Sequence, residues 1–373
     1  MSITADIAIV GAGIAGASLA AELAGHCSVL LLEAEAQPGY HSTGRSAAFW
    51  AETYGGPLVQ PLTTASGRFL ADPPPEFYDR TFLSPRGAIT LARDADTGML
   101  DAMECEFSDA GVVLERLDHS ELRARIQGLR AQWSSGLFEP ACQDIDVAAL
   151  HGAYLKCARA REARVITDAA VTSALRRGGS WELETRQGPV SAAIFVNAAG
   201  AWADQIAAMA GVPAAGIQPY RRTIAQLRTV PPAPGDLPLV LDVRGSFYFK
   251  PESGGRLWLS PHDETPCVAC DASPEEIDIA LAIDRFEQVV DWTVHQVEHR
   301  WAGLRSFTPD RLPIYGFDAR EEGFFWCAGQ GGFGIQTAPA AAKLAASLLL
   351  GATPDPLIAD IDPAPYSADR LTN

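Results

Sequence analysis

The stretch IAIVGAGIAGASLAAELAGHCSVLLLE, residues 7–33, predicts a strand, a glycine-rich turn, a helix and a second strand. Residues 7–10 are apolar and rich in β-branched side chains, and residues 29–32 are apolar without alternation. Such runs are typical of parallel strands that are covered on both faces. Residues 17–24 are small and favour a helix. We therefore interpret the stretch as one βαβ unit.

Three glycines and one acid in this unit have the spacing of a dinucleotide-binding site. Gly11, Gly13 and Gly16 match G-x-G-x-x-G, and Glu33 lies 22 positions after Gly11. The first glycine permits a tight turn, the second lets a pyrophosphate approach the backbone, and the third lets the helix pack on the strand. The helix N-terminus offers unpaired N–H groups to the phosphates, and Glu33 would accept hydrogen bonds from ribose hydroxyls.

Two further segments favour FAD over NAD. Residues 37–48, QPGYHSTGRSAA, form a loop of small and hydroxyl residues with one arginine, which suits the second half of a longer cofactor. Near the C-terminus, residues 329–334, GQGGFG, open a small-residue helix over residues 335–350. A helix N-terminus aimed at the flavin would stabilise the negative charge of its reduced form.

The composition of the chain indicates which partners and which cellular compartment to expect. The chain of 373 residues has a formal net charge of −17, which argues against nucleic acid and anionic lipid as partners. Its seven scattered cysteines fit a reducing compartment rather than a disulfide framework. Because the N-terminal segment lacks the pattern of a signal peptide and no apolar stretch is long enough to span a bilayer, we expect a soluble, cytoplasmic protein. Peripheral association with the inner membrane stays an alternative.

The order of the segments predicts an α/β protein with two domains. An apolar strand over residues 192–200 ends in a glycine turn, residues 239–260 predict an antiparallel meander, and residues 275–297 predict a helix. We expect a discontinuous Rossmann-like domain that binds FAD and an inserted, antiparallel β-rich domain that binds substrate. The first would comprise residues 1–78, 145–215 and 301–373, and the second residues 79–144 and 216–300.

Five motifs together resemble the D-amino acid oxidase superfamily of FAD-dependent oxidoreductases. They are VGAGIAG (residues 10–16), PGYHSTGRS (38–46), VNAAGAW (196–202), WAGLR (301–305) and GQGGFGIQ (329–336). Within the superfamily the resemblance is closest to bacterial D-arginine dehydrogenase and more distant to glycine oxidase and sarcosine oxidase. It covers nearly the whole chain.

The resemblance implies a glutathione-reductase-type fold with extended, non-covalent FAD and a substrate pocket over one flavin face. It implies hydride transfer from the substrate Cα–H to flavin N5, giving an imino acid that hydrolyses to a 2-keto acid and ammonia. The cofactor-binding positions that it implies are Gly11, Gly13, Ile14, Ala15, Gly16, Glu33, Ala34, His41, Ser42, Thr43, Gly44, Arg45, Ser46, Ala47, Ala48, Val171, Ala199, Gly200, Trp202, Arg305, Gly331, Gly332, Phe333, Gly334, Ile335 and Gln336.

The resemblance also implies the residues that hold the substrate. Arg222 and Arg305 would bind its carboxylate, since a guanidinium fork matches a carboxylate in two parallel hydrogen bonds. Tyr54 and Tyr248 would bind the carboxylate or shape the entrance, and the Gly332 carbonyl would receive the amine. Two alternatives stay open: either arginine could pair with an internal acid, and the adjacent Arg221 could replace Arg222.

Two positions depart from the D-arginine dehydrogenase pattern. Phe49 stands where that relative has a histidine, and Ala88 where it has a glutamate that would pair with a cationic side chain. Without the glutamate, a cationic substrate would bury an unpaired charge. We therefore expect a D-amino acid with a neutral, apolar side chain that lies against Phe49, Trp50 and Ala88.

No general base is evident near the flavin. Either water takes the amine proton, or the arginines lower the pKa of the substrate amine. We expect no metal, because His295 and His299 lack a third ligand and Cys267 and Cys270 lack a second pair. Cys327 does not match a flavin attachment site.

Other interpretations keep the fold and change the role. The substrate could be an N-methyl amino acid such as sarcosine, or a 2-hydroxy acid. A non-catalytic flavin-binding module of a larger complex is an alternative of another class. The electron acceptor, a quinone, a carrier or O₂, is not specified by the sequence.

Overall fold

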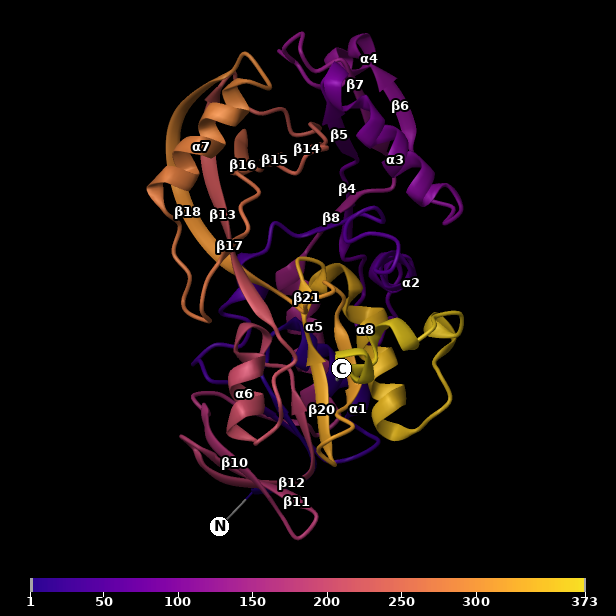
Figure 1. Ribbon diagram of the computed structural model, residues 1–373, viewed down its shortest axis with the longest axis vertical. Coiled ribbons are helices and arrows are strands. Elements are labelled where there is room, and N and C mark those ends of the chain that lie inside the picture. Colours follow the sequence, from indigo (N-terminus) through magenta and orange to yellow (C-terminus); the bar gives the residue numbers. More distant parts are fainter. Residues whose placement is uncertain (1–2, 372–373) are drawn as a thin grey trace.

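The computed structural model describes residues 3–371. The molecule is elongated, and Figure 1 shows two stacked bodies that are linked by the long strands β13 (Gln218–Val230) and β18 (Thr293–Phe307). The lower body contains the N-terminal βαβ unit and the C-terminal helix, so segments from both ends of the chain lie side by side. Mixed α/β architecture with two bodies agrees with the predicted fold class.

The lower body is built on a mixed sheet with a parallel centre. Its parallel strands have the order β9-β2-β1-β12-β20, and β10, β11 and β19 extend it in antiparallel fashion. The strands are β1 (Ile3–Val10), β2 (Val29–Leu32), β9 (Arg164–Ile166), β10 (Val171–Arg177), β11 (Ser180–Thr185), β12 (Gly188–Asn197), β19 (Ile314–Phe317) and β20 (Phe324–Ala328).

The parallel strands are covered on both faces, as their uninterrupted apolar sequence predicts. Ile7 and Ile9 of β1 pack on one side with α1 (Ile14–Leu23), α5 (Val147–Ala160) and α8 (Gly334–Leu350). Ala8 and Val10 pack on the other side with β10, β11 and α6 (Ala203–Met209). The predicted βαβ unit is confirmed.

The upper body is built on a largely antiparallel sheet. Its strand order is β21-β18-β13-β16-β15-β14-β5-β7-β6, and β17 pairs with β13. Besides β13 and β18, these strands are β5 (Ala88–Ala92), β6 (Glu115–Asp118), β7 (Ser135–Glu139), β14 (Leu239–Asp242), β15 (Tyr248–Glu252), β16 (Arg256–Ser260), β17 (Thr265–Pro266) and β21 (Gln330–Gly331). The predicted meander is β14–β15–β16.

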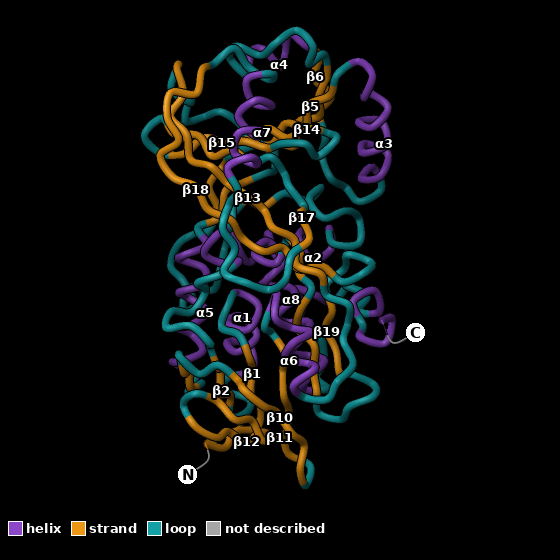
Figure 2. The backbone as a smooth tube through the Cα atoms, turned by 60° about the vertical axis from the view of Figure 1, so that its left-hand side comes forward, coloured by secondary structure: helices purple, strands orange, loops and turns teal. Residues whose placement is uncertain are grey.

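This sheet separates a core from a face that looks toward the lower body. Phe247 and Phe249 pack into a core with α4 (His119–Arg125) and α7 (Glu276–Glu287), whereas Tyr248 packs on the opposite face with Ala88 and Ile224. The alternation along β15 is the one that the sequence predicts for Tyr248. Figure 2 shows β13, β14, β15 and β18 in the upper part of the molecule and β1, β2, β10, β11 and β12 in the lower part.

The remaining elements join the bodies or lie at the surface. A small sheet has the order β3-β8-β4, with β3 (Phe49–Trp50), β4 (Leu83–Pro85) and β8 (Gln143–Ile145). Two more helices are α2 (Gln60–Ala71) and α3 (Thr97–Ser108), and a short 3₁₀ turn, η1 (Ser42–Arg45), lies in the predicted cofactor loop.

The predicted helix over residues 275–297 is wrong in its second half. Helix α7 ends at Glu287, and β18 begins at Thr293 because it pairs with β13 along its full length. His295 and His299 therefore lie on an extended strand, about 13 Å apart at ~3.3 Å per residue, which is too far for one metal ion. β18 also crosses the predicted domain boundary between residues 300 and 301.

Residues 3–371 contain neither a metal-binding cluster nor a helix that could span a membrane. Within that range no cluster of three or more His, Cys, Asp or Glu side chains is arranged to hold a metal ion. None of the helices described there has the length and apolarity to cross a bilayer.

Candidate active site

A cavity of about 430 Å³ lies between the two bodies and extends from the glycine-rich turn to the sheet face that contains Arg222. This volume is within the ~300–1,000 Å³ of ordinary ligand sites. Of the residues predicted to bind cofactor or substrate, those that line it are Gly11, Gly13, Ile14, Ala15, Glu33, Ala34, His41, Ser42, Thr43, Arg45, Ser46, Ala47, Ala48, Tyr54, Val171, Ala199, Gly200, Trp202, Arg222, Tyr248, Arg305, Gly331, Gly332, Gly334, Ile335 and Gln336.

Three predicted residues do not line this cavity. Gly16 packs against the turn, and a Cβ there would lie 1.9 Å from the Gly11 carbonyl oxygen. A Cβ on Gly44 would lie 2.8 Å from the Gly39 carbonyl oxygen, so Gly44 closes the loop. Phe333 is buried against Val59 beneath the cavity. These residues shape the walls of the cavity without facing its interior.

The glycine-rich turn is packed so closely that its first position requires glycine. Gly11 has φ +103°, and a Cβ there would lie 2.4 Å from the Ala198 carbonyl oxygen, so only glycine fits. Glu33 Oε2 accepts a hydrogen bond from the Ala12 N–H at 2.9 Å and so holds the turn. Thr43 Oγ1 accepts from the Ile14 N–H at 3.0 Å and joins the second loop to the start of α1.

The loop over residues 37–48 is fastened to the upper sheet. Ser42 Oγ donates to the Leu304 carbonyl oxygen at 2.7 Å. The Arg45 guanidinium donates to the carbonyl oxygens of Ala272 and Ala302 at 2.9 and 3.0 Å and pairs with Asp271. Arg45 thus fixes the loop through protein groups.

The cavity lining fits a dinucleotide cofactor of the FAD type. Helix α1 begins at Ile14 and helix α8 at Gly334, and both residues line the cavity. Helix N-termini favour negative charge, so one suits a phosphate and the other a reduced flavin.

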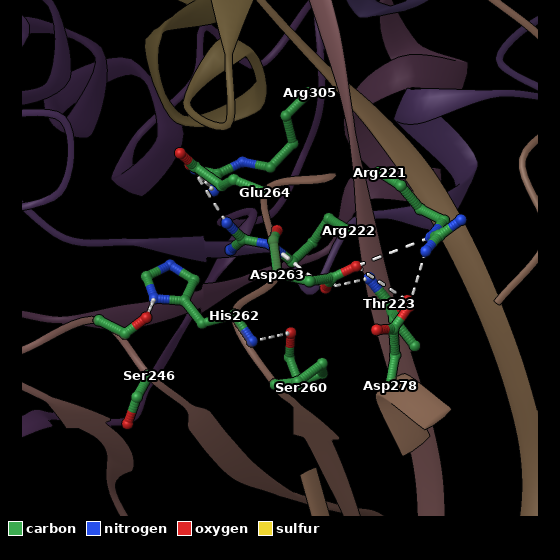
Figure 3. A network of polar contacts seen from close by, with 12 residues as sticks. Arg221, Arg222, Thr223, Ser246, Ser260, His262, Asp263, Glu264, Asp278 and Arg305 are labelled. Atoms are coloured by element: carbon green, nitrogen blue, oxygen red, sulfur yellow. Dashed lines mark hydrogen bonds and ion pairs between the residues drawn. The ribbon is translucent and has the colours of Figure 1, made fainter. Parts of the chain in front are cut away.

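Arg222 and Arg305 converge at the upper end of the cavity (Figure 3). In the β13–β18 pair Arg222 lies opposite Gly303, so Arg305, two residues along, is its diagonal neighbour on the same face. Both side chains are largely buried, and Arg305 donates a hydrogen bond to the Tyr54 hydroxyl.

The two positive charges of this pair are stabilised by a nearby negative charge. Burial and the neighbouring Arg305 guanidinium lower the pKa of Arg222. Two buried cations side by side are destabilising unless a negative charge lies between them. In the structure that charge is the Glu264 carboxylate, whose Oε1 is 3.3 Å from Arg222 Nη2 and 3.3 Å from Arg305 Nη1. An internal acid therefore reaches both arginines, which is one of the alternatives left open by the sequence.

Arg221 faces away from the cavity. Its guanidinium pairs with Glu275 at 2.5 Å and with Asp278 at 2.9 Å. Adjacent residues of a strand point to opposite faces, so Arg221 and Arg222 cannot share a site. The alternative that Arg221 replaces Arg222 is therefore disfavoured.

Gly332 touches the Arg305 guanidinium. A Cβ on residue 332 would lie 1.9 Å from Arg305 Nη2. Only glycine lets the guanidinium lie in this position against the backbone of the C-terminal loop.

A histidine next to the arginine pair was missed from the sequence. His262 Nδ1 donates to the Gly245 carbonyl oxygen at 2.9 Å, and its ring makes an edge contact with Tyr248. Burial, with Arg222 and Arg305 nearby, lowers the pKa of His262 to about 2. His262 is a single histidine in an irregular segment, so no spacing pattern could have revealed it.

The side of the cavity beyond the arginines is aromatic and apolar. Phe49 lies 5.0 Å from Tyr54 and 6.4 Å from Tyr248, measured between ring centroids, and packs in one cluster with Ala88. Trp50 does not join them, because it follows Phe49 on β3 and points the other way, where Nε1 donates to the Thr63 carbonyl oxygen at 2.8 Å. The expectation that Trp50 faces the substrate is wrong.

The cavity has further lining residues that the sequence analysis did not single out. Eight of them belong to the five motifs and could have been inferred from them: Val10, Gly39, Tyr40, Ala198, Ala201, Gly303, Leu304 and Gln330. The others are Leu32, Glu35, Ala169, Ala170, Gln205, Ile206, Met209, Ile224 and Ser306.

Comparison with known proteins places this geometry in a family. The model of the DAO family, described as FAD dependent oxidoreductase, matches residues 6–348. The mitochondrial dimethylglycine dehydrogenase of Mus musculus is 27% identical over 252 residues, which are 62% of this chain and 29% of that protein. The match therefore spans less than a third of the length of that relative.

Solved structures share the fold over almost the whole chain. The glycine oxidase from Geobacillus kaustophilus superimposes with a TM-score of 0.85 and 23% identity, covering 98% of this chain and 99% of that one. The L-proline dehydrogenase from P. horikoshii has a TM-score of 0.85 and 21% identity, covering 100% of this chain and 98% of that one. With the family match over residues 6–348, the chain belongs to the DAO family of FAD-dependent oxidoreductases.

Proposed function

We propose that this FAD-dependent oxidoreductase oxidises the Cα–N bond of a small amino acid with a neutral, apolar side chain, with the D-enantiomer as the leading candidate. An amino-acid-like substrate is supported by the names of similar proteins, such as dimethylglycine dehydrogenase and glycine oxidase. The stereochemistry, the side chain and the closer resemblance to D-arginine dehydrogenase are our predictions. The observation that supports the proposal most strongly is the largely buried Arg222–Arg305 pair in the same cavity as the glycine-rich turn.

The arginines would orient the substrate by its carboxylate. Guanidinium groups from two neighbouring strands would hold both oxygens, and the Tyr54 hydroxyl beside Arg305 would add a third polar contact. Fixing the carboxylate also fixes Cα, and orientation is most of what the protein contributes in a cofactor enzyme. Bound FAD would supply the hydride acceptor.

The far wall favours an apolar side chain. Phe49 lines the cavity and offers no charge, whereas Ala88 packs in the cluster behind it and does not line the cavity. The acid across the ladder from Ala88 is Glu139, which is 3% exposed and does not line the cavity either. Burial raises the pKa of Glu139, which favours its neutral form. A substrate with a cationic side chain would therefore lack a counter-charge.

In this proposal no protein side chain takes the proton from the substrate amine. His262, whose pKa is lowered to about 2, is too weakly basic to hold a proton at neutral pH. The amine would lose its proton to water, or bind already neutral because the two arginines disfavour a nearby cation. The Gly332 carbonyl remains the proposed acceptor for the amine.

An anaerobic substrate panel tests the proposal. Bleaching of the bound FAD should be fastest with D-leucine or D-phenylalanine and slower with D-arginine and with the L-enantiomers. Turnover of D-arginine equal to that of D-leucine would contradict the neutral side chain, and faster bleaching by the L-enantiomers would contradict the stereochemistry. If no carboxylate substrate bleaches the FAD, the non-catalytic alternative is favoured.

A second candidate is an N-substituted amino acid. It is favoured by the similarity to proteins that are named dimethylglycine dehydrogenase and L-proline dehydrogenase, whose named substrates are tertiary and secondary amines. Sarcosine, dimethylglycine and proline therefore belong in the panel, with a 2-hydroxy acid as the amine-free control. Faster bleaching by any of these than by D-leucine would select this candidate.

We also propose that the protein works in a reducing compartment, and we give an experiment that identifies its electron acceptor. The seven cysteines are all free and support a reducing compartment, such as the cytoplasm. Mixing the reduced enzyme with air or with a soluble quinone separates an oxidase from a dehydrogenase by the rate at which flavin absorbance returns.

A further inference from the structure

Glu264 already contacts both arginines that are expected to bind the substrate carboxylate, although it is not itself among the residues that line the cavity. Its Oε1 lies 3.3 Å from Arg222 Nη2 and 3.3 Å from Arg305 Nη1. Figure 3 shows the three side chains meeting at this point. A substrate carboxylate that took the same N–H donors would come close to the Glu264 charge, and like charges repel. We therefore expect an acid substrate to compete with Glu264 for these donors.

We propose that Glu264 is an internal competitor that fills the anion site in the resting protein and withdraws toward Arg311 when a substrate carboxylate enters. This inference rests on the proposed function, because it assumes that Arg222 and Arg305 bind the substrate. It makes Glu264 a residue that sets affinity for carboxylates without contacting the reacting atoms.

The backbone beneath Glu264 is firmly held, so the side chain is the part that moves. The Asp263 carbonyl oxygen accepts from Arg222 Nε at 2.7 Å, and the Asp263 carboxylate accepts from the Thr223 N–H at 2.7 Å and its hydroxyl at 3.0 Å. The Asp263 side chain is 9% exposed, whereas that of Glu264 is 34% exposed. Rotation of Glu264 thus needs no change in the segment that supports Arg222.

Arg311 provides a second partner outside the cavity. Its Nη2 is 2.9 Å from Glu264 Oε1 and 3.0 Å from Oε2, both shorter than the contacts to the cavity arginines. The Arg311 side chain is 49% exposed and its guanidinium lies 3.9 Å from the centre of the Phe307 ring. Glu264 can therefore leave Arg222 and Arg305 and keep its closest ion pair. One anion replaces another, so the charge between the buried arginines stays balanced.

The test uses the FAD-loaded protein and benzoate, an apolar carboxylate without an amine, with benzamide as the uncharged control. Binding is measured by calorimetry and by the change in flavin absorbance, so no turnover is needed. Glu264→Gln and Glu264→Ala should bind benzoate roughly three- to tenfold more tightly than the wild type, as expected for removing a partly exposed competitor. Benzamide binding should not change.

Arg311→Gln is the matched variant, and it should change benzoate affinity in the direction opposite to the Glu264 variants. It removes the outer partner, so Glu264 should compete harder and benzoate should bind more weakly than in the wild type. In the double variant the effect of Arg311→Gln should vanish, because the competitor is gone. FAD content and melting temperature are compared first. A variant with a folding defect is then excluded, and the remaining variants still decide the question.

The outcomes separate this inference from the proposed function. Equal or weaker benzoate binding in both Glu264 variants overturns the inference, as does the absence of benzoate binding in every variant. The proposed function fails separately, if no amino acid bleaches the FAD of the wild type. Tighter binding in the Glu264 variants supports the inference whichever amino acid proves to be the substrate.

Discussion

Ala88 and Glu139 lie directly opposite each other in the β5–β7 ladder. The Glu139 carboxylate accepts from the Glu52 N–H at 2.6 Å through Oε1 and from the Thr53 hydroxyl at 2.6 Å through Oε2. Both partners immediately precede Tyr54, which hydrogen-bonds to Arg305. Glu139 is therefore a positioning residue for the Tyr54 turn.

Glu139→Leu should unfold more easily and bind substrate less well. The change leaves a buried N–H and a hydroxyl without an acceptor, which costs about 1–3 kcal/mol of the free energy of unfolding. Denaturant unfolding checks the stability, and KM checks the effect on Tyr54. Glu139→Gln, which can still accept one hydrogen bond, should lie between Glu139→Leu and the wild type; a wild-type KM in Glu139→Leu would contradict the positioning role.

The raised pKa of Glu139 implies that the free energy of unfolding depends on pH. Burial raises the pKa of Glu139, so the folded state favours the neutral carboxyl. This contribution to stability is fully present below the ordinary pKa of 4.5 and is lost as the pH rises through the raised value. The free energy of unfolding of the wild type, minus that of Glu139→Gln, should therefore fall as the pH rises above 4.5. A difference that is constant up to pH 8 would contradict the raised pKa.

Replacing either cavity arginine by lysine should weaken carboxylate binding. Lysine keeps the charge and loses the planar fork, and a charge-assisted hydrogen bond is worth about 1.5–3 kcal/mol, so kcat/KM should fall roughly 10- to 100-fold in Arg222→Lys and Arg305→Lys. Arg221→Lys is the matched control, because its partners Glu275 and Asp278 lie away from the cavity. An equal loss in Arg221→Lys would show a general effect on β13.

The N-terminal unit could be predicted from sequence because its signals are local. The glycine spacing and the apolar runs around it lie within residues 7–33, and each strand is buried on both faces. The helix predicted over residues 275–297 failed at its end for the opposite reason. Pairing with β13, far away in the sequence, decides that residues 293–307 form a strand.

The site residues also differ in how far the sequence could predict them. The resemblance to the family implied Arg222 and Arg305 as substrate-binding residues, but their convergence depends on the register that places Arg222 opposite Gly303. Glu264 and His262 lie in an irregular segment without a pattern, and only the folded chain brings them to the arginines. Trp50 was placed wrongly because the face to which β3 turns depends on its pairing with β8.

FAD should be released intact when the protein is denatured. Burial raises the pKa of the Cys327 thiol to about 12, so it is protonated at neutral pH and is a poor nucleophile. Acid precipitation should leave all the flavin in the supernatant, and the mass of the chain should equal that of its sequence. A chain that retains the mass of FAD would contradict non-covalent binding.

The pH profile of kcat/KM should report the substrate rather than the enzyme. His262, with a pKa of about 2, adds no ionisation above pH 5, so the neutral amine should be the form that reacts. We expect kcat/KM to fall at low pH with a midpoint that shifts between substrates of different amine pKa. His262→Asn should leave this midpoint unchanged. A flat profile from pH 6 to 10 would refute the requirement for a neutral amine.

Gly332→Ala should abolish the carboxylate anchor while FAD stays bound. The new Cβ would lie 1.9 Å from Arg305 Nη2, and the end of a long side chain moves more easily than the backbone, so Arg305 should be displaced and the fold retained. A shift of about 1 Å in an orienting group can cost ~100-fold in kcat/KM. Flavin absorbance and kcat/KM are measured together. Gly98→Ala is the control, since a Cβ on that residue of α3 meets nothing within 4 Å. Loss of FAD from Gly332→Ala would instead mean that residue 332 supports the cofactor, and unchanged kcat/KM would mean that Arg305 does not hold the substrate.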